Sequence, residues 1–123
     1  MSKTKALRKI VKEKLQTIPG ETYHRLAPSN AVFPCKVFTL DHAQFTDARD
    51  DIYLDVDVWD RSLDPKGAED IADQIEALFR NATLPAPPIY PTFFRDIRYS
   101  LLDPDKTLQH IQLRFLVQLY EEE

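Results

Sequence analysis

In two segments of the chain every second residue is apolar, and this period of two predicts strands. Every second residue of the segment 52–58 is aliphatic, and the same holds for 111–119, where Phe115 joins the aliphatic set. A period of two places all apolar side chains of a segment on one face. Each segment is therefore predicted to be a half-buried antiparallel strand with its apolar set facing the core.

Two other segments repeat apolar residues at spacings of three and four, which predicts helices that bury one face. The first spans about residues 4–17 and ends before Pro19-Gly20. The second follows Asp64-Pro65, an N-cap residue and a proline suited to the first helical position. Because only this second helix separates strands, the pattern predicts an α+β fold, a mostly antiparallel β-sheet with two α-helices packed on one face.

The whole chain of 123 residues is predicted to be a single domain, since chains divide only beyond roughly 250 residues. The polar stretch 41–51 has no clear period and is predicted to be a long, mobile loop. The predicted order is a basic helix at 1–18, strands at about 22–26, 35–40 and 52–60, a helix at 65–80, a proline-rich connector at 81–92, and strands at 93–102 and 107–120.

Charge is distributed unevenly along the chain. The formal net charge is −4, but residues 1–14 contain six basic residues and one acidic residue. Residues 41–76 contain twelve acidic and three basic residues. This separation is compatible with ordinary solvated faces, or with docking onto complementary surfaces, including those of other copies. Sequence-specific DNA binding is not expected of a chain that is acidic overall.

The residues that alternate with the predicted strand core form a second candidate surface. Tyr53 and Trp59 lie on the non-core face of segment 52–60, and Leu116 and Tyr120 lie on that of the last strand. If these four side chains meet, they form a candidate interface, since aromatic residues are frequent among interface hot spots.

Asp55 and Asp57 also share this face, about 7 Å apart by the strand rise. Paired carboxylates can hold Mg²⁺ or Mn²⁺, so a metal-dependent phosphodiesterase is one alternative. The other interpretation is that they are solvent-facing acids that discourage edge pairing, and this is favoured because no third ligand has a supporting spacing. The two glycines, the single cysteine and the three scattered histidines predict no phosphate loop, metal site, catalytic residue or cofactor.

The complete pattern resembles the small tail-completion, or tail-terminator, proteins of long-tailed phages and prophages. The likeness rests on the amphipathic first helix, the proline-bounded segment 31–38, the Val-Asp-Val-Trp-Asp sequence at 56–60, the helix 68–78, and the Asp-Pro-Asp turn with the final strand 110–120. This resemblance implies a structural protein and not an enzyme, which assembles as a hexameric ring at the head-proximal end of the tail tube. It further implies that the ring stops tube polymerisation, joins the tube to head–tail connector proteins, and lets DNA pass without specific binding.

The expected location is therefore the virion, with the host cytoplasm during assembly and no membrane contact. The free chain is expected to be a ring or a monomer that assembles only on the tube. Opposite charges suit a ring, in which one patch meets a different patch of the neighbour. The candidate assembly interface comprises Lys5, Arg8, Lys9, Lys12, Tyr53, Asp55, Asp57 and Trp59, and the candidate lumen or tube-contact loop comprises Asp41, Phe45, Asp47, Asp50 and Asp51. A small protein-binding adaptor domain remains as another alternative.

Overall fold

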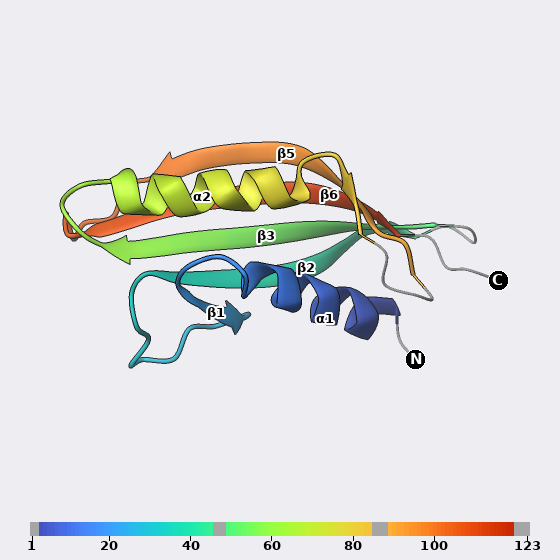
Figure 1. The fold of residues 1–123 in the computed structure, drawn as a ribbon, viewed down its shortest axis with the longest axis horizontal. Helices are drawn as coiled ribbons and strands as arrows, with labels where there is room; N and C mark the ends of the chain where they lie inside the picture. Colours follow the sequence, from blue (N-terminus) through green and yellow to red (C-terminus); the bar gives the residue numbers. More distant parts are fainter. Residues whose placement is uncertain (1–2, 46–48, 85–88, 120–123) are drawn as a thin grey trace.

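The computed structural model describes residues 3–45, 49–84 and 89–119, which form one six-stranded sheet with two helices on one face (Figure 1). In chain order the elements are α1 (Lys3–Leu15), β1 (Glu21–His24), β2 (Cys35–Phe45), β3 (Asp50–Arg61), α2 (Lys66–Phe79), β4 (Ala82–Thr83), β5 (Thr92–Leu101) and β6 (Leu108–Leu119). The strand order across the sheet is β1-β2-β3-β6-β5-β4. Only β1 and β2 pair in parallel, which confirms the predicted α+β class.

The core lies between the helices and the sheet, as the two periodicities predict. In β3, Ile52, Leu54, Val56 and Val58 are all fully buried, and they pair across the sheet with the alternating apolar residues of β6. The helix α2 adds five buried side chains, those of Ala68, Ile71, Ala72, Ile75 and Phe79. The helix α1 adds three, those of Leu7, Val11 and Leu15. The face of the sheet opposite the helices is called the outer face below.

The predicted loop at 41–51 is wrong, because β2 and β3 extend through most of it as one antiparallel hairpin. Their pairing continues to Phe45 and Asp50, with a bulge between His42 and Gln44. Residues 46–48 lie outside the described part of the chain. Backbone hydrogen bonds between the two strands do not require apolar side chains. The strands therefore continue here without the apolar alternation from which the sequence prediction recognises a strand.

The proline-rich connector at 81–92 also contains regular structure that was not predicted. The two residues of β4 pair with Thr92 and Phe93 of β5, and residues 85–88 lie outside the described ranges. The remaining predicted elements are confirmed with shifts of about one to three residues at their ends. The helix α2 begins at Lys66, with Pro65 and not Asp64 at the N-cap position. Asp64 precedes this cap, and its Oδ1 accepts the backbone N–H of Lys66 at 2.9 Å.

Within the described ranges, neither helix is long and apolar enough to cross a membrane.

Candidate functional site

Four rows of side chains cross the outer face over β5, β6 and β3. They follow from the strand register and are, in order from β5 to β3, Phe94–Leu116–Tyr53, Ile97–Arg114–Asp55, Tyr99–Gln112–Asp57 and Leu101–His110–Trp59. The prediction that Tyr53, Trp59 and Leu116 lie on one face is therefore confirmed, whereas Tyr120 lies outside the described residues. Apart from Leu116, the side chains of the β3 and β6 columns are polar or aromatic, whereas those of the β5 column are mostly apolar.

The carboxylate of Asp55 is held by Arg114 in a two-point ion pair. Arg114 donates from Nε to Asp55 Oδ1 at 2.8 Å and from Nη2 to Oδ2 at 3.2 Å. The hydrogen bonds that Arg114 donates to Asp55 raise the pKa of its guanidinium. That guanidinium also lies over the Tyr53 ring, 4.7 Å from its centroid. Asp55 is only 7% exposed, and both of its carboxylate oxygens accept hydrogen bonds from Arg114 within the sheet.

Asp57, which follows Asp55 on β3, pairs with a different residue of β6. Its Oδ1 lies 2.7 Å from Nε2 of His110, and the His110 ring stacks on Trp59 with a centroid separation of 3.7 Å and an interplanar angle of 14°. The two acids therefore form separate pairs and do not converge on one point. In the described part of the chain, no three His, Cys, Asp or Glu side chains come close enough to hold a metal ion. The predicted role of Asp55 and Asp57 as solvent-facing acids that discourage edge pairing is wrong as well, because Asp55 is only 7% exposed and β3 lies inside the sheet, between β2 and β6. The two acids are instead paired with residues of β6.

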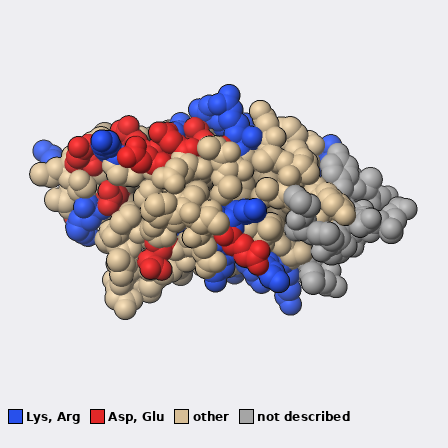
Figure 2. Space-filling view, viewed as in Figure 1, with Lys and Arg blue, Asp and Glu red and all other residues tan. Residues whose placement is uncertain are grey.

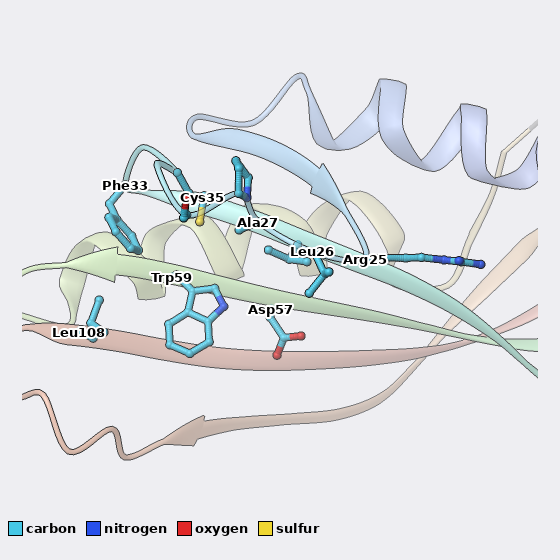
Figure 3. A pocket seen from close by; sticks show the side chains of 12 residues that line it. Arg25, Leu26, Ala27, Phe33, Cys35, Asp57, Trp59 and Leu108 are labelled. Atoms are coloured by element: carbon cyan, nitrogen blue, oxygen red, sulfur yellow. The ribbon is translucent and has the colours of Figure 1, made fainter.

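A groove opens beside Trp59, between the outer face and the segment that joins β1 to β2 (Figure 3). Its volume is about 410 Å³, within the range of about 300–1,000 Å³ typical of ligand pockets. The twelve residues that line it are Arg25, Leu26, Ala27, Pro28, Ser29, Ala31, Phe33, Cys35, Val37, Asp57, Trp59 and Leu108. Sequence reasoning missed this groove because the joining segment has no periodicity that places it over the sheet.

The basic residues of the predicted interface lie on the opposite face from Trp59. Lys5, Arg8, Lys9 and Lys12 belong to α1, which packs on the helix-covered face beside β1 and β2. The structure therefore divides the predicted interface into two groups, one on α1 and one on the outer face of β3. Figure 2 shows the helix-covered face, with acidic side chains gathered over α2 beside several basic ones, and with further basic side chains along the edge formed by α1.

A buried lysine holds the end of α1 to the sheet. Lys36 of β2 is fully buried, and its Nζ donates to the carbonyl oxygens of Ile18, Pro19 and Gly20 at 2.8, 3.0 and 2.7 Å. Burial lowers the pKa of this ammonium to about 8. Gly20 is required at this turn because its φ is +97°, a conformation that other residues rarely adopt. Lys36 thus fixes the position of the basic helix.

The predicted lumen residues fall at the far end of the β2–β3 hairpin. Asp41 is exposed and lies opposite Tyr53, and Asp51 pairs with Arg49 through Oδ1 and Nε at 2.9 Å. Asp50 lies opposite Phe45 in the register. Asp47 lies outside the described residues, so the structure brings Asp41, Asp50 and Asp51 to one hairpin end and leaves Asp47 unplaced.

The apolar column on β5 was also missed by sequence reasoning. Phe94, Ile97, Tyr99 and Leu101 are each 36–44% exposed on the outer face. A bulge between Arg95 and Ile97 shifts the alternation by one residue, so the sequence of β5 does not show a continuous period of two. The five large apolar residues between positions 93 and 101 were the sequence feature that could have indicated this column.

Comparisons with known proteins agree with this architecture. Residues 5–119 match the family described as "Tail completion protein gp17". Among solved structures, the chain is similar to one described as "Virion of native gene transfer agent (GTA) particle", with a TM-score of 0.68, 12% identity, and coverage of 97% of this chain and 92% of that chain. A comparison with curated protein sequences gave no match. Because the family match spans nearly the whole chain, this protein belongs to the tail completion protein gp17 family and is a structural protein of the phage tail in the virion.

Proposed function

We propose that copies of this chain form a ring, hexameric as the family resemblance implies, that closes the head-proximal end of the tail tube. The ring would stop tube growth and present the surface that head–tail connector proteins bind. The family match over residues 5–119 supports a role in completing the tail. The chain acts by shape and charge, and DNA passes through the ring without specific binding.

The observation that carries the ring proposal is the opposite charge of the two helices. The helix α1 contains six basic residues and one acidic residue, whereas α2 contains four acidic residues and one basic residue. The first packs beside β1 and β2, and the second packs over β3, β6 and β5. The α1 side (α1, β1 and β2) and the α2 side (α2, β5 and β4) are thus different patches on opposite sides of each subunit. Such patches build closed rings when the rotation between subunits closes.

Ionic strength tests this proposal directly. Rings assembled on purified tail tubes, or in solution, should dissociate as the salt concentration rises from about 0.1 M to 1 M, because the Debye length falls from about 10 Å to about 3 Å. Light scattering measures the free ring, and electron microscopy measures the fraction of closed tube ends. Equal ring stability in molar salt would show that charge does not hold the subunits together.

The acidic hairpin end is proposed to line the lumen or contact the tube. Asp41, Asp50 and Asp51 lie there, and acidic side chains would repel the phosphates of passing DNA. Phe45 and Asp47 complete this proposed set from the sequence. A chain with Asp41→Asn, Asp47→Asn and Asp50→Asn should fold and enter tails normally, but give fewer infectious particles. An unchanged plaque yield from assembled particles would count against this role.

Enzyme activity is not part of the proposed function. Asp55 is tied to Arg114 and Asp57 to His110, so neither carboxylate is prepared for a metal ion. Purified chain should show no Mn²⁺-dependent hydrolysis of a phosphodiester. Hydrolysis that disappears in the Asp55→Ala, Asp57→Ala double variant would contradict this and favour a phosphodiesterase.

A further inference from the structure

The sheet has an open edge along most of β5. Within the described residues, β4 pairs with only Thr92 and Phe93, so the stretch from Phe94 to Leu101 has no strand on that side. At the opposite margin of the sheet, β1 has no described strand beyond it (Figure 1). An unpaired edge presents backbone N–H and C=O groups that can pair with a strand of another chain.

Two residues of β5 direct their backbone groups toward this open edge. Just beyond the β3–β6 pairing, Ser62 donates its backbone N–H to the carbonyl oxygen of Thr107 at 2.7 Å, which fixes the alternation of hydrogen bonds along β6. The even-numbered residues of β6 therefore bond to β5. Their partners on β5 after the bulge are Ile97, Tyr99 and Leu101. The backbone groups of the residues between these partners, Arg98 and Ser100, point to the open edge.

Two residues of β1 likewise direct their backbone groups away from the sheet. Glu21 and Arg25 donate their backbone N–H groups to carbonyl oxygens on the β2 side, at 3.2 and 2.9 Å. Because alternate residues of an edge strand face its one neighbour, the backbone groups of Thr22 and His24 point outward.

These two pairs of residues lie at the same level of the sheet. Through the successive pairings of β1, β2, β3, β6 and β5, Thr22 is level with Ser100 and His24 is level with Arg98. The strands β1 and β5 also run in opposite directions, because β1 is parallel to β2 and three antiparallel pairings separate β2 from β5. A second copy placed edge to edge, without displacement along the strands, therefore presents its β1 antiparallel to β5.

We propose that β1 of one copy pairs with residues 98–101 of β5 in the next copy, so that the sheets of neighbouring ring subunits become continuous. This inference rests on the proposed ring and adds backbone hydrogen bonds to its charged contact. In this register, Thr22 faces Ser100 and His24 faces Arg98, and each pair exchanges its outward N–H and C=O groups.

The identity of the partner follows from the agreement of separate features. Strand direction, level and outward backbone groups all match between the two margins of this one chain. The same edge-to-edge approach brings the basic α1 of one copy beside the acidic α2 of the other on the helix-covered face. Together these features identify a second copy, and not a tube protein, as the strand that completes the β5 edge.

The pairing also places two aromatic side chains together on the outer face. Tyr23 is level with Tyr99, and both lie on the same face as Asp57 in the register. Tyr99 is 43% exposed in the single subunit. Aromatic pairs across adjacent strands stabilise a sheet, so this contact gives Tyr99 of the apolar column a partner in the ring.

Disulfide cross-linking in assembled tails tests this pairing. The background is Cys35→Ser, which removes the single native thiol. On oxidation, a chain with both Thr22→Cys and Ser100→Cys should link to its neighbours as dimers and higher multimers on a non-reducing gel. Directly opposite residues of such a pair have Cα atoms about 5.5 Å apart, within the range of about 4.4–6.8 Å that a disulfide allows. The Thr22 hydroxyl has no hydrogen-bond partner among the described residues, so its replacement removes no hydrogen bond.

Two matched controls define the register. Thr22→Cys with Leu101→Cys places the thiols on opposite faces of the sheet, and Ser100→Cys alone provides one thiol; both should give only monomers. Absence of multimers from the first pair, in tails whose ends are closed, would overturn the inference and leave the ring proposal intact. A dimer from Ser100→Cys alone would also overturn it, because β5 would then pair with β5 of another copy. Absence of the unmodified chain from the tube end would contradict the ring proposal and the pairing with it.

A change of the backbone alone gives an independent result. Ser100→Pro removes an N–H that faces the open edge and none that bonds to β6, so the variant should fold, as judged by circular dichroism. Its incorporation into tails should fall about tenfold or more, because a hydrogen bond between subunits is lost and the ring repeats this loss at every contact. Ser100→Ala keeps the N–H and should incorporate normally. A folded Ser100→Pro chain that incorporates as well as Ser100→Ala would contradict the pairing.

Discussion

The two helices are nearly equal in length and cover the same face of the sheet, yet their charged residues are used differently. In α2, the acids hold β5. Glu76 pairs with Arg95 and Arg98, and Asp73 also pairs with Arg98 at 2.6 Å. In α1, no ion pair between described residues involves Arg8, Lys9 or Lys12. The charge of α2 is thus partly used within the subunit, whereas most of the charge of α1 faces outward.

This difference predicts that α2 contributes mainly to the stability of the fold and α1 mainly to association between subunits. Changes to the buried face or the ion pairs of α2 should weaken the fold, because they remove contacts within the subunit. Changes to the exposed bases of α1 should leave the fold intact and weaken association, because each such base lies on a solvated face. The predictions below test this division from the largest expected effect on the free energy of unfolding to the smallest.

The largest loss of stability is expected at the end of α2. The Phe79 ring is fully buried, and its centroid lies 4.8 Å from that of Phe93 and 5.6 Å from that of Phe115. Phe79→Ala should reduce the free energy of unfolding by about 3–5 kcal/mol, measured by urea denaturation. Ala77→Ser on the exposed face of the same helix should change it by less than about 0.5 kcal/mol. A loss below about 1 kcal/mol for Phe79→Ala would show that the fold does not depend on the buried face of α2.

An intermediate, pH-dependent effect is expected where α1 is attached. The pKa of Lys36 is about 8 in the folded chain, whereas the ordinary value for a lysine, taken here for the unfolded chain, is 10.5. Between these values the unfolded chain binds more protons, so this group makes stability rise with pH, by on the order of 3 kcal/mol in total. Lys36→Met should remove that rise, measured by urea denaturation from pH 7.5 to 10.5.

The neighbouring thiol requires a matched background for this measurement. Burial raises the pKa of Cys35, so its titration lowers stability as the pH rises and acts in the opposite direction. The comparison is therefore between Cys35→Ser and the Cys35→Ser, Lys36→Met double variant. Equal pH slopes in these two chains would contradict the assigned role of Lys36.

The smallest effect is expected for the ion pairs between α2 and β5. Glu76→Gln removes a charge that faces both Arg95 and Arg98, and should cost about 1 kcal/mol because these pairs are partly exposed. Lys12→Gln in α1 should not measurably change stability, since its side chain is exposed. Thermal or urea unfolding measures the free energy of unfolding of both variants. Equal losses in the two variants would contradict the proposed difference between the helices.

Much of the fold could be predicted from the sequence because its local signals agree with its tertiary structure. The period of two at 111–119 and the start of α2 directly after Asp64-Pro65 are examples, and both were predicted correctly. The hairpin end near Asp41 and the strand β4 were missed because backbone pairing there does not depend on a buried face. The pairing of Asp55 with Arg114 depends on strand order, which a single sequence does not provide.

The candidate surfaces were harder to predict than the strands. The alternation placed Tyr53 and Trp59 correctly on the outer face, but the bulge near Arg95 concealed the apolar column on β5. The groove forms only when an irregular segment folds over β2 and β3, so no periodicity signals it. The basic helix was evident from charge alone, whereas its separation from Trp59 required the three-dimensional structure.

A charge exchange between the two helices tests the head-to-tail ring most directly. Reversing Arg8, Lys9 and Lys12 to Glu, or Glu69 and Asp70 to Lys, should leave tubes unclosed, because like charges across a contact cost several kcal/mol, which reduces association more than ~100-fold. Both sets of reversals in one chain restore opposite charges at every contact. Electron microscopy of tail lengths should then show normal, closed tails for the combined variant and overlong tails for each single set. Overlong tails for the combined variant as well, or normal tails for all three, would contradict pairing of α1 with α2 between neighbouring subunits.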